Sequence, residues 1–274
     1  MSKADVSPLR QGEVVVWWQR LGAVSEDNGW MDQAASILDE AEQTRLARML
    51  GWQNRSTYIL AHVMARGLLT RSTGIAASDW RFEAGEQGKP EVIQPDGLPR
   101  LRINISHTQG FAAVAIGLDH DLGVDVEWLG RRAPNLDLVA RRVFSERERQ
   151  SIFAASTDAQ LEMFLRFWTL KEAYVKATGK GLAQPLGEVT VDPAALNVTF
   201  EAQSKEPARD WVFHQEQPSP EHLLAVAVNA PQTGETISDG AGAEKTAGDA
   251  QSLKPVQIDV SPAPMDYLET ISRK

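Results

Sequence analysis

A carboxylate inside the apolar face of a long amphipathic helix is the feature that most constrains this chain. Residues Ala159–Thr178 have helical periodicity, and Glu172 falls within the apolar arc, with Lys176 at its edge one turn further on. A carboxylate buried alone costs several kcal/mol, so Glu172 must be paired, bound to a metal or protonated. The alternative is a surface Glu172–Lys176 ion pair, which contributes only about 0.3–0.5 kcal/mol. The arc consists of Leu161, Phe164, Leu165, Trp168 and Val175.

A second acidic pattern lies in the segment Leu122–Trp128, LGVDVEW, which alternates as a β-strand does. Asp125 and Glu127 share one face, and three apolar residues share the other. Two carboxylates so spaced can converge on one hard cation that prefers oxygen ligands, most naturally Mg²⁺. With Glu172, three carboxylates could share one metal ion. The alternative for the strand alone is an ordinary solvated face.

Strands and helices are expected in both halves of the chain, which predicts an α+β fold of two subdomains that meet near residues 117–122. We expect an N-terminal subdomain over residues 1–118 and a C-terminal one over 119–229. Residues 230–274 are expected to form a disordered tail, because the stretch after Ala230 is rich in Gly, Ala, Thr, Ser and acids. The predicted helices are 32–49, 55–70, 138–153 and 159–178; the predicted strands are 13–18, 101–106, 111–116, 122–128, 189–191, 197–202, 211–215 and 223–228.

Charge and composition exclude several classes of protein. The formal net charge of −9 argues against a nucleic-acid-binding protein, which would need an excess of Lys and Arg. The absence of cysteine excludes thiol catalysis and Cys-ligated zinc, and the five histidines form no metal-binding pair. No apolar run approaches the roughly 18 residues that span a bilayer, and the N-terminus lacks a signal-peptide pattern, so a cytoplasmic protein without membrane contact is expected.

Candidate phosphate contacts come from three places. Residues 43–78 contain no acid but several arginines, among them Arg45, Arg48 and Arg55, which could grip phosphate or simply line a solvated helix. Lys89 lies in the turn GEQGKPEV, and Ser106-His107 ends a strand at a hairpin turn. The histidine could donate to a phosphate, although most turn histidines are only solvent-exposed.

Taken in order and spacing, four motifs resemble one family, the Sfp-type 4′-phosphopantetheinyl transferases. The motifs are GKP at 88–90, NISH at 104–107, GVDVE at 123–127 and FWTLKEAYVKATGKGL at 167–182. GKP and NISH are weak alone, but a WxxKEAxxK helix after a GVDxE strand is specific. The resemblance covers roughly residues 17–228 and leaves the tail outside it.

The resemblance implies two pseudo-symmetric subdomains with the active site in the cleft between them. It implies that Asp125, Glu127 and Glu172 bind the metal and that Lys176 lies near the reacting phosphate. Basic residues in the early helices of the family meet the 3′-phosphate of coenzyme A, but here Thr57 stands where an arginine is usual. The residues that it implies for coenzyme A are Lys89, Pro90, Ser106 and His107, with Arg45, Arg48 and Arg55 as candidates for the 3′-phosphate.

The implied activity is Mg²⁺-dependent transfer of 4′-phosphopantetheine from coenzyme A to a serine of an apo acyl or peptidyl carrier protein, with Mn²⁺ as a possible substitute and Glu172 and Lys176 as catalytic residues. A monomer is expected, since one chain holds both halves. Two alternatives stay open: a Mg²⁺-dependent phosphohydrolase that uses the same carboxylates, and a non-catalytic module that binds carrier proteins. The module predicts loss of a metal carboxylate, yet all three are present.

Overall fold

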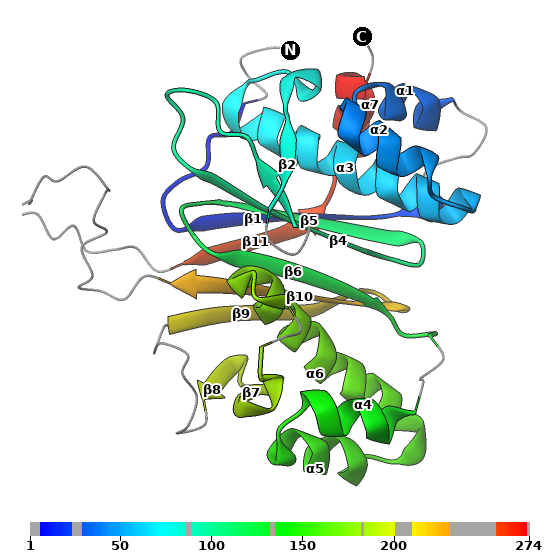
Figure 1. Cartoon of the computed structure of the whole chain (residues 1–274), viewed down its shortest axis with the longest axis vertical. Coiled ribbons are helices and arrows are strands. Elements are labelled where there is room, and N and C mark those ends of the chain that lie inside the picture. Colours follow the sequence, from blue (N-terminus) through cyan, green and yellow to red (C-terminus); the bar gives the residue numbers. More distant parts are fainter. Residues whose placement is uncertain are drawn as a thin grey trace, which may run out of the picture.

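Two β-sheets lie face to face, and each is covered on its outer side by a 22-residue helix (Figure 1). This computed structural model describes residues 6–23, 29–85, 89–131, 135–181, 184–200, 210–230 and 256–272. Mixed strands and helices in both halves confirm the expected α+β class. Gly88 and Leu182, at the ends of two motifs, lie outside the described residues.

The first sheet has the order β11-β1-β5-β4, in which only the β1–β11 pair is parallel. Helix α3 covers its outer face, and the small hairpin β2-β3 lies beside β4. The elements of this half are β1 (Glu13–Arg20), α1 (Trp30–Ser36), α2 (Glu40–Ala47), α3 (Trp52–Thr73), β2 (Phe82–Ala84), β3 (Pro90–Val92), β4 (Leu101–Thr108), β5 (Phe111–Leu118), β11 (Gln257–Pro262) and α7 (Met265–Ser272), with short 3₁₀ turns at Leu21–Ala23 and Ala77–Asp79.

The second sheet has the order β6-β10-β9 and is antiparallel throughout. Helix α6 packs on its outer face, with α4, α5 and the hairpin β7-β8 around it. The elements of this half are β6 (Leu122–Trp128), α4 (Leu136–Val143), α5 (Glu146–Ala154), α6 (Thr157–Thr178), β7 (Val189–Asp192), β8 (Asn197–Phe200), β9 (Asp210–Ser219) and β10 (His222–Ala230), with a 3₁₀ turn at Leu186–Glu188.

Strand β5 is buried along its whole length because both faces of its sheet are covered. Phe111, Ala113 and Ala115 point into the core between the two sheets, whereas Val114 and Ile116 point toward α3. This is why the sequence there is a continuous apolar run rather than an alternating one.

Two expected helices are each divided in two by a capping box. Asp39 accepts a hydrogen bond from the backbone N–H of Glu42 and starts α2, so the expected helix 32–49 becomes α1 and α2. Ser145 does the same with Glu148 and separates α4 from α5. In each case the cap satisfies backbone N–H groups that a continuous helix would have bonded internally.

The expectation of a disordered tail over residues 230–274 is wrong for residues 256–272. Strand β11 extends the first sheet beside β1, and α7 packs on α1 and α3, with Leu268 fully buried. Apolar side chains spaced along this segment bury enough surface to order it. The first half of the fold is thus completed by the C-terminal end of the chain, while residues 231–255 lie outside the described part.

Candidate active site

The close packing of α6 on β6 brings the predicted acidic residues together. Val124 and Val126 point into the core between the sheets, so Asp125 points the opposite way, toward α6. A Cβ atom added at Gly123 would lie 2.1 Å from the carbonyl oxygen of Ala173. Only glycine therefore lets the helix lie this near the strand, and the same contact places the α6 side chains beside the strand carboxylates.

Lys176 lies at the centre of a polar network between the two halves. Its Nζ donates to Asp125 Oδ1 at 2.7 Å, to Ser106 Oγ at 2.8 Å and to the carbonyl oxygen of Val124 at 3.2 Å. Ser106 Oγ in turn donates to Asp125 Oδ1 at 3.1 Å and accepts from the backbone N–H of Val126. The network fixes the lysine ammonium against a buried carboxylate and a strand of the other sheet.

The three predicted carboxylates share one electrostatic environment. Burial, and then the negative charge of Asp125, raises the pKa of Glu172 to about 7. Burial followed by Asp125 also raises the pKa of Glu127, although Arg131 Nη1 donates to Glu127 Oε2 at 2.7 Å. Burial raises the pKa of Asp125 against the opposing effect of Lys176. Burial therefore leaves the charged form of each of these carboxyl groups poorly stabilised by its protein surroundings.

The oxygen atoms of these carboxylates are suitable ligands for a divalent cation, although the side chains are not arranged as a complete metal site. Asp125 Oδ2 and Glu172 Oε1 are buried and have no hydrogen-bond partner among the described residues. Lys176 bonds to the other oxygen of Asp125 and Arg131 bonds to Glu127, and within the described residues no three His, Asp or Glu side chains are arranged to hold a metal ion as they stand. Two buried, unpartnered carboxylate oxygens are nevertheless the groups that a hard cation would satisfy.

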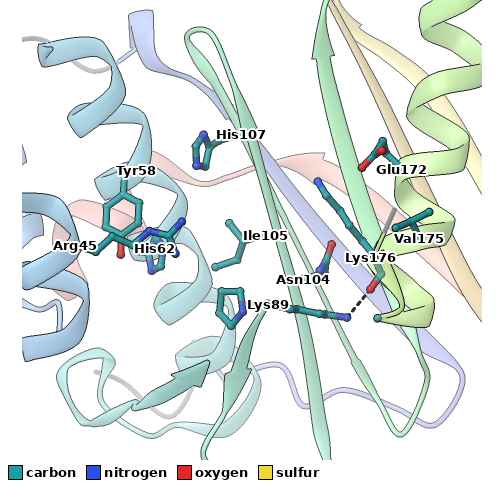
Figure 2. Close-up of a pocket in the computed structure, with 13 residues that line it drawn as sticks. Arg45, Tyr58, His62, Lys89, Asn104, Ile105, His107, Glu172, Val175 and Lys176 are labelled. Carbon is teal, nitrogen blue, oxygen red and sulfur yellow. Dashed lines mark hydrogen bonds between the residues drawn. The ribbon is translucent and has the colours of Figure 1, made fainter. Parts of the chain in front are cut away.

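A cavity of about 320 Å³ opens between the two halves beside this network. Figure 2 shows Glu172 and Lys176 on the α6 side and Arg45, Tyr58 and His62 on the opposite side. Of the predicted residues it is lined by Arg45, Lys89, Pro90, His107, Glu172 and Lys176. The cleft expected between the halves is thus present, with basic groups on both walls.

The predicted arginines divide into one that lines the cavity and two that do not. Arg45 lies in the lining, and its guanidinium carbon is 5.9 Å from the ring centre of Tyr58. Arg48 is exposed at the end of α2, and Arg55 Nη1 donates to the carbonyl oxygen of Leu46. Neither Arg48 nor Arg55 is among the residues that line this cavity.

Lys89 bridges the two halves at the cavity floor. Its Nζ donates to the carbonyl oxygen of Lys176 at 2.8 Å (Figure 2). It also donates to the carbonyl oxygen of Leu122 at 3.2 Å. Burial, and then the positive charge of Arg102, lowers the pKa of Lys89 to about 8. The ammonium thus caps the end of α6 as well as lining the cavity, a role that its turn sequence did not indicate.

His107 lines the cavity among several basic groups. Desolvation lowers its pKa to about 4, and the next causes are the positive charges of His62, Lys176 and Arg45. These groups come from three different elements, α3, α6 and α2, and converge on one space. Such a space attracts an anion with several negative charges.

Several lining residues were not singled out by sequence. The sequence predicts Tyr58 only as an apolar helix position and gives no signal for His62, yet both line the cavity. Asn104 lies on the expected polar face of its strand and accepts a hydrogen bond from the backbone N–H of Val124 at 2.8 Å. For Asn104, its place on the polar face of a predicted strand is the sequence signal that could have identified it. For His62 there is no comparable signal in the neighbouring residues.

Two family models together match most of the chain. The model of the 4′-phosphopantetheinyl transferase superfamily matches residues 121–227, and the model described as 4′-phosphopantetheinyl transferase, N-terminal, matches residues 25–118. The first contains β6 and α6, and the second contains α3 and β4. The C-terminal strand and helix, β11 and α7, lie outside both matches.

Several curated proteins are similar over more than half of the chain. The 4′-phosphopantetheinyl transferase HetI of Nostoc sp. is 29% identical over 220 residues, which cover 80% of this chain and 89% of that protein. The 4′-phosphopantetheinyl transferase ffp of Bacillus subtilis is 30% identical over 160 residues, covering 58% of this chain and 68% of that protein. The L-aminoadipate-semialdehyde dehydrogenase-phosphopantetheinyl transferase of Mus musculus is 28% identical over 218 residues, covering 74% of this chain and 70% of that protein.

No helix in the described segments has the length and apolar character that a membrane crossing requires.

Proposed function

This chain belongs to the 4′-phosphopantetheinyl transferase superfamily, and we propose that it transfers the 4′-phosphopantetheine group of coenzyme A to a serine of an apo acyl or peptidyl carrier protein. The observation that carries the proposal is one cavity that joins Glu172 and Lys176 to a wall of basic residues. Coenzyme A combines a diphosphate, which must react, with a separate 3′-phosphate. A cavity with reactive groups at one side and cations at the other suits both.

Asp125, Glu127 and Glu172 would hold Mg²⁺, or Mn²⁺ in its place. The support is the pair of unpartnered oxygens on Asp125 and Glu172 and the raised pKa of all three carboxyl groups. When bound, the ion would supply positive charge that offsets the negative charge of the diphosphate. It would also offset the charge that develops as the bond to the bridging oxygen breaks.

Glu172 and Lys176 have complementary roles in the proposed reaction. The serine oxygen of the carrier bonds to the phosphorus next to pantetheine, and the bond from that phosphorus to the bridging oxygen breaks, which releases 3′,5′-ADP. Glu172 accepts the serine proton, directly or through a water molecule, since a group whose pKa lies near the operating pH is an efficient base. Lys176, held by Ser106 and Asp125, donates to the departing phosphate oxygen.

Intact-mass measurement of apo carrier proteins tests this function. We expect a gain of one phosphopantetheine on the carrier, with 3′,5′-ADP released only when coenzyme A, Mg²⁺, enzyme and carrier are all present. Release of nucleotide without carrier would instead support the phosphohydrolase. Carrier binding without any mass gain would support the non-catalytic module. We further expect a monomeric, cytoplasmic protein, and size-exclusion chromatography tests the first of these.

Replacing Lys89 by alanine is expected to raise the KM for coenzyme A about 5- to 10-fold, as loss of one charged contact would. The variant loses a cation from the cavity and the link between the β2-β3 hairpin and the end of α6. The Mg²⁺ concentration for half-maximal activity should change less than about twofold, because Lys89 touches none of the three carboxylates. Steady-state kinetics measures both, and an unchanged KM would contradict the assignment.

A further inference from the structure

A buried charge network stands behind the basic wall of the cavity. Arg66 of α3 has no solvent exposure, and its guanidinium bonds to the Glu42 carboxylate and to the carbonyl oxygens of Ala77 and Trp80. Glu42 Oε2 also accepts the backbone N–H of Asp39 at 2.8 Å. These contacts fix the carboxylate of Glu42 between α2 and α3.

The second oxygen of Glu42 points to His62. The distance from Glu42 Oε1 to His62 Nδ1 is 2.6 Å, and both side chains are buried. Burial alone would raise the pKa of Glu42, but its hydrogen bond and charge interaction with His62, together with Arg66, lower it overall. Glu42 is therefore a carboxylate, an acceptor only, and His62 Nδ1 must carry the hydrogen.

The other nitrogen of His62 is left for a ligand. His62 lines the cavity, and within the described residues its Nε2 has no hydrogen-bond partner. Its ring lies against Tyr58, with ring centres 4.0 Å apart, and Tyr58 in turn lies beneath Arg45. A phosphate at Nε2 would place the ring between two anions, the Glu42 carboxylate and the phosphate, and an imidazole ring that carries hydrogen on both nitrogens donates to each.

The position of His62 decides which phosphate this is. Figure 2 shows it across the cavity from Glu172 and Lys176, the side where the diphosphate would react. A cation on the far wall can meet only a phosphate at a distance from the reacting bridge. Arg48 and Arg55 do not line the cavity, so the far wall has His62 and Arg45 as its basic groups, with His107 between the walls.

We propose that His62, held in place by Glu42, is a specificity-determining residue that selects a nucleotide bearing a 3′-phosphomonoester over one bearing a 3′-hydroxyl. This inference rests on the proposed function, because it takes coenzyme A as the substrate. It adds a histidine–carboxylate pair to a site that the sequence assigned to arginines alone.

Calorimetric titration with 3′,5′-ADP and with 5′-AMP tests the inference without any carrier protein. The wild-type chain should bind 3′,5′-ADP more tightly than 5′-AMP. His62→Gln should weaken binding of 3′,5′-ADP about tenfold, as expected for loss of one charged hydrogen bond, while binding of 5′-AMP changes less than about twofold. An unchanged preference, or an equal loss for both nucleotides, would overturn the inference.

A matched control is His120→Gln, which removes another buried histidine, bonded to the carbonyl oxygen of Asn229 and absent from the cavity lining. It should bind both nucleotides as the wild type does. The wild-type chain offers a second measurement that needs no folded His62 variant: nitrogen NMR of the histidine rings. The Nε2 resonance of a carboxylate-bonded ring should shift with 3′,5′-ADP and stay unchanged with 5′-AMP; the same response to both would contradict the assignment.

Kinetics separates this inference from the proposed function. If carriers gain phosphopantetheine equally from coenzyme A and from dephospho-coenzyme A, with equal KM values, the transferase activity is supported and the role of His62 is contradicted. If 3′,5′-ADP is preferred in binding and His62→Gln abolishes that preference, yet no carrier gains mass, the role of His62 stands and the function falls.

Discussion

Replacing Glu172 by glutamine is expected to reduce phosphopantetheine transfer by about 10²- to 10⁴-fold, the range typical of removing a general base, while leaving the protein folded. Glutamine keeps the size of the side chain but accepts no proton at neutral pH. It also gives up one of the two carboxylate oxygens that have no partner among the described residues. Transfer is measured by intact mass of the carrier protein over time.

The same substitution should stabilise the metal-free protein. The pKa of Glu172 is raised from 4.5 to about 7, so folding disfavours its charged form. The cost is absent below pH 4.5, grows as the pH rises toward 7 and is complete above that pH. In chelator at pH 8 we expect Glu172→Gln to melt a few degrees higher than the wild type, given roughly 2–4 °C per kcal/mol for a chain of about this size.

Metal binding gives an independent reading of this site. Mg²⁺ should raise the melting temperature of the wild type by mass action and have little effect on Glu172→Gln. Glu162→Gln is the matched control, because Glu162 lies on the exposed face of the same helix and pairs with Arg166. It should keep full activity and the response to Mg²⁺. Undiminished transfer by Glu172→Gln would contradict the assignment of Glu172 as the general base.

The acidic side of the site could be predicted because each part is local. Alternation in β6 places Asp125 and Glu127 on one face, and helical periodicity places Glu172 in the apolar arc of α6. These three carboxylates come together if α6 packs on β6, and the motifs of α6 and β6 occur together in the family. The glycine that permits this approach, Gly123, was part of the motif, but the backbone contact that requires it is visible only in three dimensions.

The opposite wall could not be predicted because it depends on contacts between distant residues. His62 is a polar residue within a largely buried helix, and its partner Glu42 lies 20 residues earlier in α2. Lys89 finds its acceptors 33 and 87 residues further along the chain. No periodicity encodes such pairs. The divided helices are different, since DEAE at 39–42 and SERE at 145–148 are local capping signals that the helical pattern outweighed.

Composition mispredicts the C-terminal segment because this segment and the stretch before it differ in their apolar content. Residues 231–255 contain almost no large apolar side chains, whereas 256–272 place Val256, Ile258 and Val260 against the core between the sheets. Leu268 of α7 joins the core beneath α3, and Tyr267 meets the ring of Trp17 with ring centres 6.1 Å apart. A short apolar segment is ordered by an existing sheet edge, which composition alone does not describe.

Replacing Leu268 by alanine is therefore expected to destabilise the protein by about 2–5 kcal/mol, the usual cost of emptying a fully buried leucine site. The melting temperature should fall by roughly 5–15 °C, as differential scanning calorimetry would show. Leu138→Ala is the matched control, since Leu138 is 67% exposed on α4 and should change stability by less than about 0.5 kcal/mol. Equal melting temperatures for Leu268→Ala and the wild type would mean that the C-terminal segment is not part of the folded core. A drop confined to Leu268→Ala would establish that residues outside both family matches hold the first sheet and α3 together, and with them the basic wall of the cavity.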